Sequence, residues 1–168
     1  MAMSTSEPHS GEPHPPAVQR VADAAAAKGL KIKIVRTEKS ARSAEEAAAA
    51  VGAEVGQIVK SLVFRGRDSG MPHLLLVSGA NRVEETTMTG ALGEALERPD
   101  AAYVREVTGF AIGGVAPLGA TSDIAVYMDE DLFRYATVWA AAGSPNHVFE
   151  VVPLQLRSAT GARLGPVK

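Results

Sequence analysis

The sequence predicts an α+β domain built around a mixed β-sheet. Two observations lead to this prediction: helical and strand-like segments alternate early in the chain, and pairs of apolar strands joined by short polar turns follow. The expected order is helix, strand, helix, two strands, helix, then an irregular loop and further strands. No internal repeat is visible in the chain.

The composition excludes several classes of protein. At 168 residues the chain fits one domain that buries most of its apolar surface without disulfides or metals. It has no cysteine, which excludes a thiolate zinc site and a cysteine nucleophile and is compatible with a cytoplasmic location. The formal net charge of -2 argues against a protein that holds nucleic acid mainly through its phosphates, so any such contact should be local and weak.

The N-terminal segment differs in composition from the rest. Residues 1–16 are rich in Pro, Ser, Gly and His and have no apolar core for a signal peptide, which predicts a disordered leader. No apolar run approaches the roughly 18 residues of a membrane span, so no membrane association is expected. The folded domain is expected over residues 17–168.

The first three expected elements follow from spacing and capping signals. Residues 17–28 have apolar side chains at helical spacing and are followed by Gly29 as a C-cap. Residues 31–36 alternate polar and apolar side chains, the pattern of a half-buried strand. Ser43 precedes two glutamates and an alanine run, which predicts an N-capped helix with acidic residues at its positive end.

The next strand contains a lysine within its apolar run. Residues 57–66 are mostly β-branched, aromatic or large aliphatic and end at Gly66, but Lys60 interrupts them. A lysine there costs desolvation free energy unless its ammonium group reaches a partner or a cleft. Position alone favours a side chain on the solvent face or one that extends to the surface, and the alternative is a functional lysine in a cleft.

A second apolar strand and two helices come next. Residues 73–79 follow a polar turn at 67–70, and this short connection predicts a hairpin at the centre of the sheet. A helix is expected over 82–96, although two glycines weaken it. A short helical turn is expected at 101–107.

Residues 108–119 form the least regular segment, with four glycines and one proline among apolar residues. A surface linker would be polar, so we expect a shaped loop. Paired glycines let the backbone approach a ligand closely or adopt positive φ, with N–H groups free to bind an oxyanion or phosphate. A tight crossover between strands is the other interpretation of this composition.

The last part of the chain is expected to contain three strands, two short helices and a turn, at residues 124–128 (strand), 129–133 (helical turn), 136–141 (strand), 143–147 (turn), 148–152 (strand) and 153–160 (helix). The turn reads Gly-Ser-Pro-Asn-His, residue types that favour turns. The strands around it are therefore expected to form a second hairpin.

The sequence offers little for nucleophilic or metal chemistry. It has no Gly-x-Ser-x-Gly motif, and two of its four histidines lie in the leader. No paired histidines and no His-x-Glu pattern support a metal site, so neither a metal nor a cofactor is expected, and His147 is interpreted as a surface turn residue.

What remains is a lysine on a buried strand, a glycine-rich loop and a glycine turn. If these converge, they form a pocket with one ammonium group and several backbone N–H donors but no protein nucleophile. Such a pocket suits an ester or acyl carbonyl whose oxyanion needs stabilising. Water or a hydroxyl of the substrate would then be the attacking group.

The segment 57–64, the glycines of 108–119 and the late glycine Gly143 occur in an order that resembles the YbaK/ProX family. These are trans-editing aminoacyl-tRNA deacylases related to the editing insertion of bacterial prolyl-tRNA synthetases, and the resemblance covers residues 17–167. It implies a single YbaK-like α+β domain with a mixed, barrel-like sheet flanked by helices. It also implies hydrolysis of the ester between a wrong amino acid and the 3′-terminal adenosine of a tRNA. The implied partners are the tRNA 3′ acceptor end and an aminoacyl-tRNA synthetase.

The resemblance assigns roles residue by residue. Lys60 matches the family lysine that binds and orients the acceptor end, and Ser61 stands where many members have threonine or serine. Gly113, Gly114 and Pro117 match the loop that closes on the aminoacyl group, with backbone amides near the carbonyl. Lys60 would act electrostatically and not as a general base, unless its pKa were strongly depressed, and a ribose hydroxyl of the tRNA would help to activate water.

The late turn is implied to contact substrate as well. Gly143 matches the glycine after the late strand, while Ser144, Asn146 and His147 meet the pattern of the alanine-clearing branch only in part. These positions are the other expected substrate-binding residues.

The removed amino acid stays open at this stage. The cysteine-clearing branch commonly has a serine and an aspartate near the late glycine, where this chain has Ala141 and Val148. Two non-catalytic interpretations also stay open: a module that binds a tRNA end or a nucleotide without turnover, and a domain that docks on a synthetase.

Overall fold

The computed structural model describes residues 13–168. The predicted leader, residues 1–16, therefore lies mostly outside the described residues, and Pro16 is already the first residue of a helix. The described chain forms five α-helices, α1 (Pro16–Ala27), α2 (Ala44–Val51), α3 (Glu85–Leu92), α4 (Ala101–Thr108) and α5 (Pro153–Thr160). Its strands are β1 (Ile34–Arg36), β2 (Ile58–Gly66), β3 (Pro72–Ser78), β4 (Leu96–Glu97), β5 (Ala125–Asp129), β6 (Val138–Ser144), β7 (His147–Val151) and β8 (Arg163–Gly165). Two short 3-10 helices are η1 (Val55–Gln57) and η2 (Glu130–Arg134).

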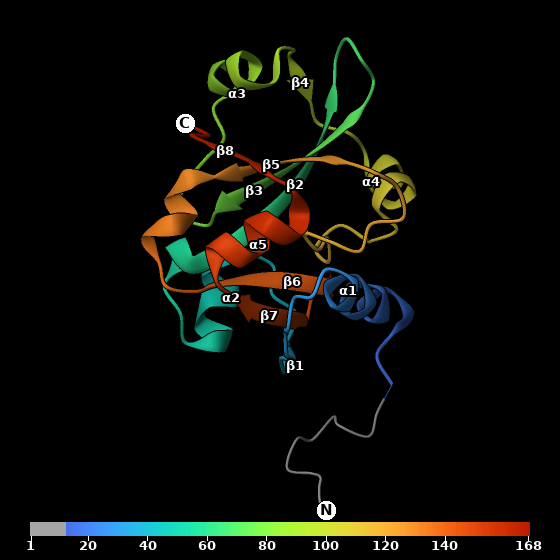
Figure 1. Ribbon diagram of the computed structural model, residues 1–168, viewed down its shortest axis with the longest axis vertical. Coiled ribbons are helices and arrows are strands. Elements are labelled where there is room, and N and C mark those ends of the chain that lie inside the picture. Colours follow the sequence, from blue (N-terminus) through green and yellow to red (C-terminus); the bar gives the residue numbers. More distant parts are fainter. Residues whose placement is uncertain (1–12) are drawn as a thin grey trace, which may run out of the picture.

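All of these strands belong to one mixed sheet, which confirms the predicted α+β class (Figure 1). The strand order is β1-β7-β6-β2-β3-β5-β8, and β4 pairs with β2 outside this path. Both predicted hairpins are present, since β2 pairs antiparallel with β3 and β6 pairs antiparallel with β7. The sheet is not closed as a barrel would be, because β1 and β8 at its two ends do not pair with each other.

Strand β3 is buried on both of its faces. Leu74 and Leu76 belong to a larger core that includes residues of α1 and α5. Leu75 and Val77 belong to a smaller core that includes Met88 of α3. This double burial explains the uninterrupted apolar run of the strand, because neighbouring side chains point to opposite faces of a sheet.

Two predicted elements are shorter than expected. The helix predicted over 82–96 ends at Leu92, because Gly93 adopts φ 83° and caps it by donating its N–H to the Thr89 carbonyl. The residues after this cap form strand β4, which pairs with β2. The strand predicted over 31–36 is reduced to β1.

The second hairpin is tighter than predicted. Strand β6 continues through Ser144 and β7 begins at His147, so only Pro145 and Asn146 lie between them. A register shift between Ala141 and Ser144 accommodates the extra residues of β6 as a bulge. Strand β8 was not predicted, because its three residues carry too short a pattern to recognise.

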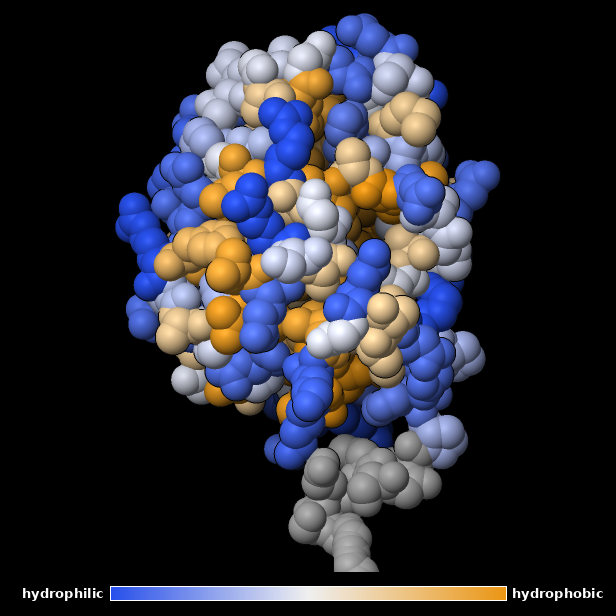
Figure 2. Space-filling view, in the orientation of Figure 1, coloured by the Kyte–Doolittle hydropathy of each residue, from blue (hydrophilic) through white to orange (hydrophobic). Residues whose placement is uncertain are grey.

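The surface carries isolated hydrophobic side chains. Among the described residues the exposed large ones are Met71, Ile112, Val152, Leu154 and Leu164. On the face shown in Figure 2, hydrophobic areas are divided by hydrophilic side chains. None of the described helices is both long and apolar enough to cross a membrane.

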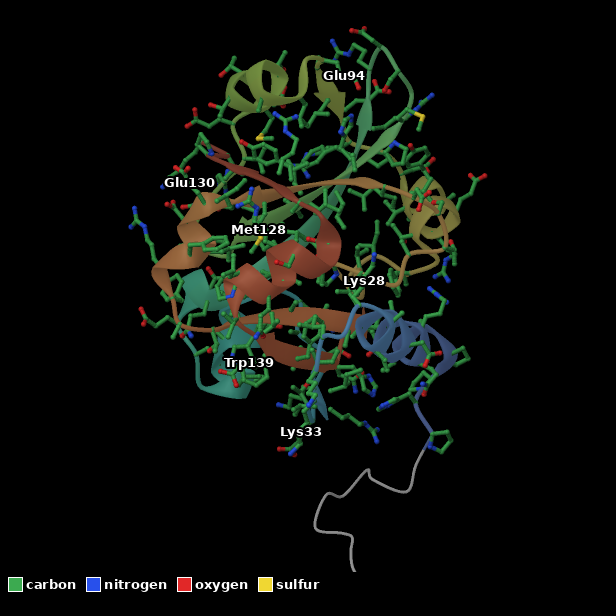
Figure 3. All side chains as sticks on the ribbon, in the orientation of Figure 1. Lys28, Lys33, Glu94, Met128, Glu130 and Trp139 are labelled. Carbon is green, nitrogen blue, oxygen red and sulfur yellow. The ribbon has the colours of Figure 1, made fainter. Side chains whose placement is uncertain are left out.

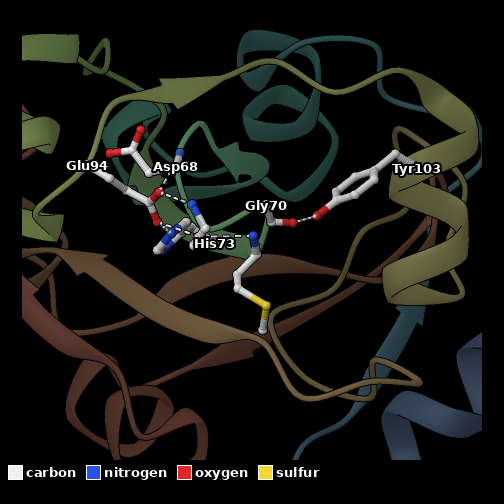
Figure 4. A network of polar contacts seen from close by, with 7 residues as sticks. Asp68, Gly70, His73, Glu94 and Tyr103 are labelled. Atoms are coloured by element: carbon white, nitrogen blue, oxygen red, sulfur yellow. Dashed lines mark hydrogen bonds and ion pairs between the residues drawn. The ribbon is translucent and has the colours of Figure 1, made fainter.

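Glu94 holds the tip of the β2–β3 hairpin from the segment between α3 and β4 (Figure 4). Its Oε1 accepts hydrogen bonds from the backbone N–H groups of Asp68 and Ser69, at 3.0 and 2.9 Å. Its Oε2 accepts from the Ser69 hydroxyl at 2.7 Å and lies 3.0 Å from His73 Nε2. These bonds, led by the one from the Ser69 backbone, lower the pKa of Glu94 from 4.5 to about 2.

This shift predicts a pH dependence of stability. The folded state keeps Glu94 ionised down to a pKa of about 2, whereas the unfolded chain binds the proton near 4.5, so stability should fall as the pH drops across that interval. Glu94→Gln removes this contribution. The difference in urea midpoint between wild type and variant should therefore shrink as the pH drops from 4.5 toward 2. A difference that stays constant over this interval would contradict the role given to Glu94.

Candidate functional site

A cavity of about 450 Å³ lies along β2. It is lined by residues 58–64 of β2, by α2 and the segment before it, by residues 139–141 of β6, by residues 98–99, and by part of the glycine-rich loop. We call this space the main cavity. Trp139 of β6, labelled in Figure 3, is one of the lining residues.

The structure brings together three of the predicted site residues at the main cavity. Lys60, Ser61 and Gly113 line it. Gly114 and Pro117 are buried and are not part of the lining. The segments predicted to converge from β2 and from the glycine-rich loop therefore do so, but not every residue of the loop reaches the cavity.

The Lys60 side chain ends at a buried polar network. Its Nζ donates a hydrogen bond of 2.5 Å to the backbone carbonyl of Asn81. The Asn81 side-chain amide donates to Asp129 Oδ2 and to Asp131 Oδ2, both at 2.8 Å. Asp129 Oδ2 also accepts from the Ser78 backbone N–H at 3.0 Å. The Asn81 carbonyl that accepts from Lys60 is thus held in place, because the Asn81 side chain makes two hydrogen bonds of its own.

Burial and nearby charges shift the pKa of Lys60. Desolvation lowers it from 10.5, the charge of Arg82 lowers it further, and the carboxylates of Glu45 and Asp129 act in the opposite direction. The net direction is downward. Lys60 is therefore a partly desolvated cation whose ammonium group bonds to a backbone carbonyl and does not lie free on the solvent face of the strand. Its functional role stays a prediction.

Loss of Asp129 should weaken the fold. Asp129→Ala leaves the Ser78 N–H without its acceptor and removes one of the two acceptors of the Asn81 amide, so we expect a loss of about 2–4 kcal/mol in the free energy of unfolding. Asp131→Ala removes one acceptor of Asn81 and should cost about 1 kcal/mol. Urea unfolding of the two variants measures this order, and an equal loss in both would contradict it.

The glycine-rich loop is anchored at both of its ends by Arg20 of α1. The Arg20 guanidinium donates to the Gly109 carbonyl at 2.8 Å and to the Gly119 carbonyl at 3.1 Å, and it lies 4.8 Å from the centre of the Phe110 ring. This single side chain fixes where residues 109–119 begin and end. The sequence analysis missed Arg20, because nothing in its helical context marks it.

The middle of the loop forms a tight turn. The Gly114 N–H donates to the Ala111 carbonyl at 2.9 Å, and Gly113 adopts φ 94°. Such a turn favours glycine at its third position, because other residues rarely adopt positive φ. The turn uses the Gly114 N–H, and Gly113 is the glycine of this pair that lines the cavity.

The residues of the late turn lie apart from the main cavity, except for Pro145. Asn146 and His147 line a separate cavity of about 470 Å³ together with residues 13–15. Ser144 Oγ and His147 Nδ1 share a hydrogen bond of 2.5 Å. His147 is buried rather than a surface residue, so that interpretation of the sequence was wrong.

Gly143 and Gly114 are sites of close backbone packing. A Cβ atom at Gly143 would lie 2.8 Å from the Ala17 carbonyl oxygen of α1, and one at Gly114 would lie 2.8 Å from the Ser144 Cα. Only glycine lets the loop, β6 and α1 approach this closely.

Two substitutions distinguish the cost of a backbone clash at Gly143 from the cost of placing alanine at a positive φ. Gly143→Ala meets both a positive φ of 100° and a backbone clash, so it should destabilise the protein by about 2–4 kcal/mol. Gly93→Ala has φ 83° but no neighbour within 4 Å, and it should cost about 1 kcal/mol. Thermal or urea unfolding compares the two, and similar losses would show that packing at Gly143 is unimportant.

Two arginines at the main cavity were not singled out from the sequence. Arg42 precedes α2, and Arg98 lies 5.5 Å from the centre of the Phe64 ring of β2. Together with Lys60 they are the charged side chains of the lining, which among the described residues includes no carboxylate, histidine or cysteine. The cavity therefore combines apolar walls with positive charge and suits a ligand that carries phosphates and an uncharged group.

The aminoacyl-tRNA editing domain family matches residues 38–159, which is more than two thirds of the chain. The chain belongs to this family. The expected YbaK/ProX-type membership is thereby confirmed.

Individual relatives agree with the family assignment. A crystal structure described as that of a candidate trans-editing enzyme for prolyl-tRNA synthetase superposes with a TM-score of 0.87 at 46% identity, covering 93% of this chain and 99% of that one. The YwhH protein of Bacillus subtilis (strain 168), whose name states no function, is 33% identical over 73% of this chain and 78% of its own length. EbsC of Enterococcus faecalis (strain ATCC 700802 / V583), named as a candidate Cys-tRNA(Pro)/Cys-tRNA(Cys) deacylase, is 26% identical over 74% of this chain and 76% of its own. The family and these names support the predicted aminoacyl-tRNA deacylase activity.

Proposed function

We propose that this protein removes a wrongly attached amino acid from tRNA by hydrolysing its ester in the main cavity. The observation that carries the proposal is the meeting of Lys60, Ser61 and Gly113 around one cavity whose charged side chains are all cationic. A terminal nucleotide brings phosphates, which the cations favour, and an aminoacyl ester, which the apolar walls enclose.

The roles follow from position. Lys60 orients the acceptor end by its charge, and the Gly113 amide polarises the ester carbonyl as negative charge develops on its oxygen. The lining supplies no histidine or carboxylate to act as a general base. A water molecule, activated with the help of a ribose hydroxyl of the tRNA, completes hydrolysis.

The cavity favours a small amino acid without charge. Ala141 and Val148, the positions at which a cysteine-clearing enzyme is expected to carry polar residues, both line it with apolar side chains. Apolar walls discriminate between side chains that differ by one methylene or one hydroxyl by only about 10–200-fold. We therefore expect a graded preference among small amino acids and not an absolute one.

The partners we propose are the 3′ acceptor end of a mischarged tRNA and a synthetase of the prolyl type. The trans-editing description of the structural relative supports this choice. With a net charge of -2, the protein gains little affinity from phosphates at a distance and would release its tRNA readily.

The test is deacylation of tRNAs charged with Ala, Ser, Thr, Cys and Pro by wild type, Lys60→Ala and the control Lys28→Ala. Lys28 is an exposed lysine at the end of α1 (Figure 3). Wild type and the control should release at least one amino acid at the same rate, while Lys60→Ala should lose about 10²–10³-fold in kcat/KM. Because the pKa of Lys60 lies below 10.5, activity should also fall as the pH rises into the alkaline range.

Two other outcomes would contradict the proposal. If folded wild type releases no amino acid and Lys60→Ala binds the acceptor end more weakly, the protein is a non-catalytic binding module. If there is no release and the substitution does not change binding, the protein is a domain that docks on a synthetase. Circular dichroism of each variant establishes that the fold is intact.

A further inference from the structure

The main cavity lies at the edge of β2 and not on one face of it. Residues 60–64 are consecutive and all line the cavity. Neighbouring side chains of a strand point to opposite faces, so a cavity that touches every residue in a run must lie at the strand's edge. Backbone N–H and C=O groups project at such an edge.

This edge of β2 is paired only at its two ends. On the side away from β3, β6 pairs with Ile58 and Val59, and β4 pairs with Arg65 and Gly66. No strand pairs with residues 60–64 on that side. The gap, residues 60–64, makes up most of the part of β2 that lines the cavity, residues 58–64.

The hydrogen bonds at the ends of β2 show which residues face the gap. The Ile58 carbonyl accepts from Gly79, and the Gly66 N–H donates to Met71, so both groups point toward β3. The β2–β3 register between them is unbroken. In an antiparallel pair the residues that face the partner alternate with residues that face away.

Ser61 and Val63 therefore direct their backbone groups away from β3. Arg65 and Arg67 continue the same alternation. Arg65 pairs with Glu97 of β4, and the Arg67 N–H donates to the Ala95 carbonyl at 2.8 Å, so both also face away from β3. Within residues 13–168, the outward N–H and C=O groups of Ser61 and Val63 have no hydrogen-bond partner. The buried Ser61 hydroxyl also lacks one among the described residues. Unpaired polar groups beside a cavity are costly unless water or a ligand satisfies them.

We propose that this open edge binds the aminoacyl group of the substrate as if it were one residue of an added strand, an inference that rests on the proposed function. The α-amino group donates to the carbonyl oxygen of Ser61 or Val63. The two carbonyls are about 6.7 Å apart along the strand, too far for one nitrogen to bind both. Among the described residues the lining has no carboxylate that would attract the α-amino group, so the outward carbonyls of Ser61 and Val63 are the acceptors we assign to it.

The chemistry of an aminoacyl ester matches this edge. In a strand, each residue presents one N–H and one C=O, separated by the Cα atom, to its neighbour. The aminoacyl ester has the same arrangement, an amino group and a carbonyl on either side of one tetrahedral carbon. Side-chain identity plays no part in such pairing. The edge would therefore recognise any α-amino acid, while the apolar walls select its side chain.

The first test compares each tRNA that wild type deacylates with its α-hydroxy analogue, made by deaminating the same charged tRNA. The ester, the side chain and the tRNA stay the same, and only the amino group changes. The neutral hydroxyl still donates one hydrogen bond but lacks the charge of the amino group, and charge-assisted hydrogen bonds are roughly twice as strong, so kcat/KM should fall by about 10-fold. Equal rates for the two substrates would overturn the inference while leaving the proposed function intact. Failure to deacylate any aminoacyl-tRNA would contradict the proposed function first.

The second test observes the backbone directly. Wild type is titrated with a 3′-amide-linked aminoacyl-adenosine, and amide hydrogen exchange is measured by NMR. The carbonyl oxygen of the analogue can accept two hydrogen bonds, one from Gly113 and one from the outward N–H of Ser61 or Val63, so at least one of these two strand amides should exchange more slowly in the complex. The Leu62 amide already pairs with β3 and serves as the internal control. Binding of the analogue with no change at either outward amide would overturn the inference.

Discussion

The incomplete pairing of β2 is the constraint on which the rest of the site depends. Strand β3 supports β2 along its length, whereas β6 leaves it after Val59 and β4 joins it only at Arg65. A central strand is thus rigid on one edge and open on the other. The gap gives the cavity a fixed backbone wall, and the sheet does not have to rearrange to admit a ligand.

Two anchors fix the positions of Lys60 and of the glycine-rich loop. The backbone carbonyl of Asn81, a residue that Asp129 holds in place, accepts a hydrogen bond from the Lys60 ammonium, and Arg20 of α1 donates to the carbonyls at the two ends of the loop. Each anchor bonds to backbone carbonyls. The positions of Lys60 and Gly113 are therefore set by the fold itself and do not require bound substrate.

Much of the fold could be predicted from the sequence, because the two hairpins and most helix ends have local signals. The helix expected over 82–96 was too long because the αL conformation of Gly93 outweighed the apolar spacing. Lys60 stood out as a charge in an apolar run. Asn81 follows strand β3, and Asp129 is the last residue of strand β5. These two residues could be predicted to lie close together only if the parallel pairing of β3 and β5 were already known. Gly143 was predicted at the site but packs on α1, since sequence cannot distinguish a glycine that approaches a ligand from one that approaches a helix.

A crystal structure of the protein with a non-hydrolysable aminoacyl-adenosine analogue would show where the aminoacyl group binds. We predict that this group lies in the gap of β2, with its nitrogen within hydrogen-bond distance of the Ser61 or Val63 carbonyl and its carbonyl oxygen near the Gly113 amide. An analogue bound at the separate cavity beside His147, or bound in the main cavity with its aminoacyl group pointing away from β2, would contradict it.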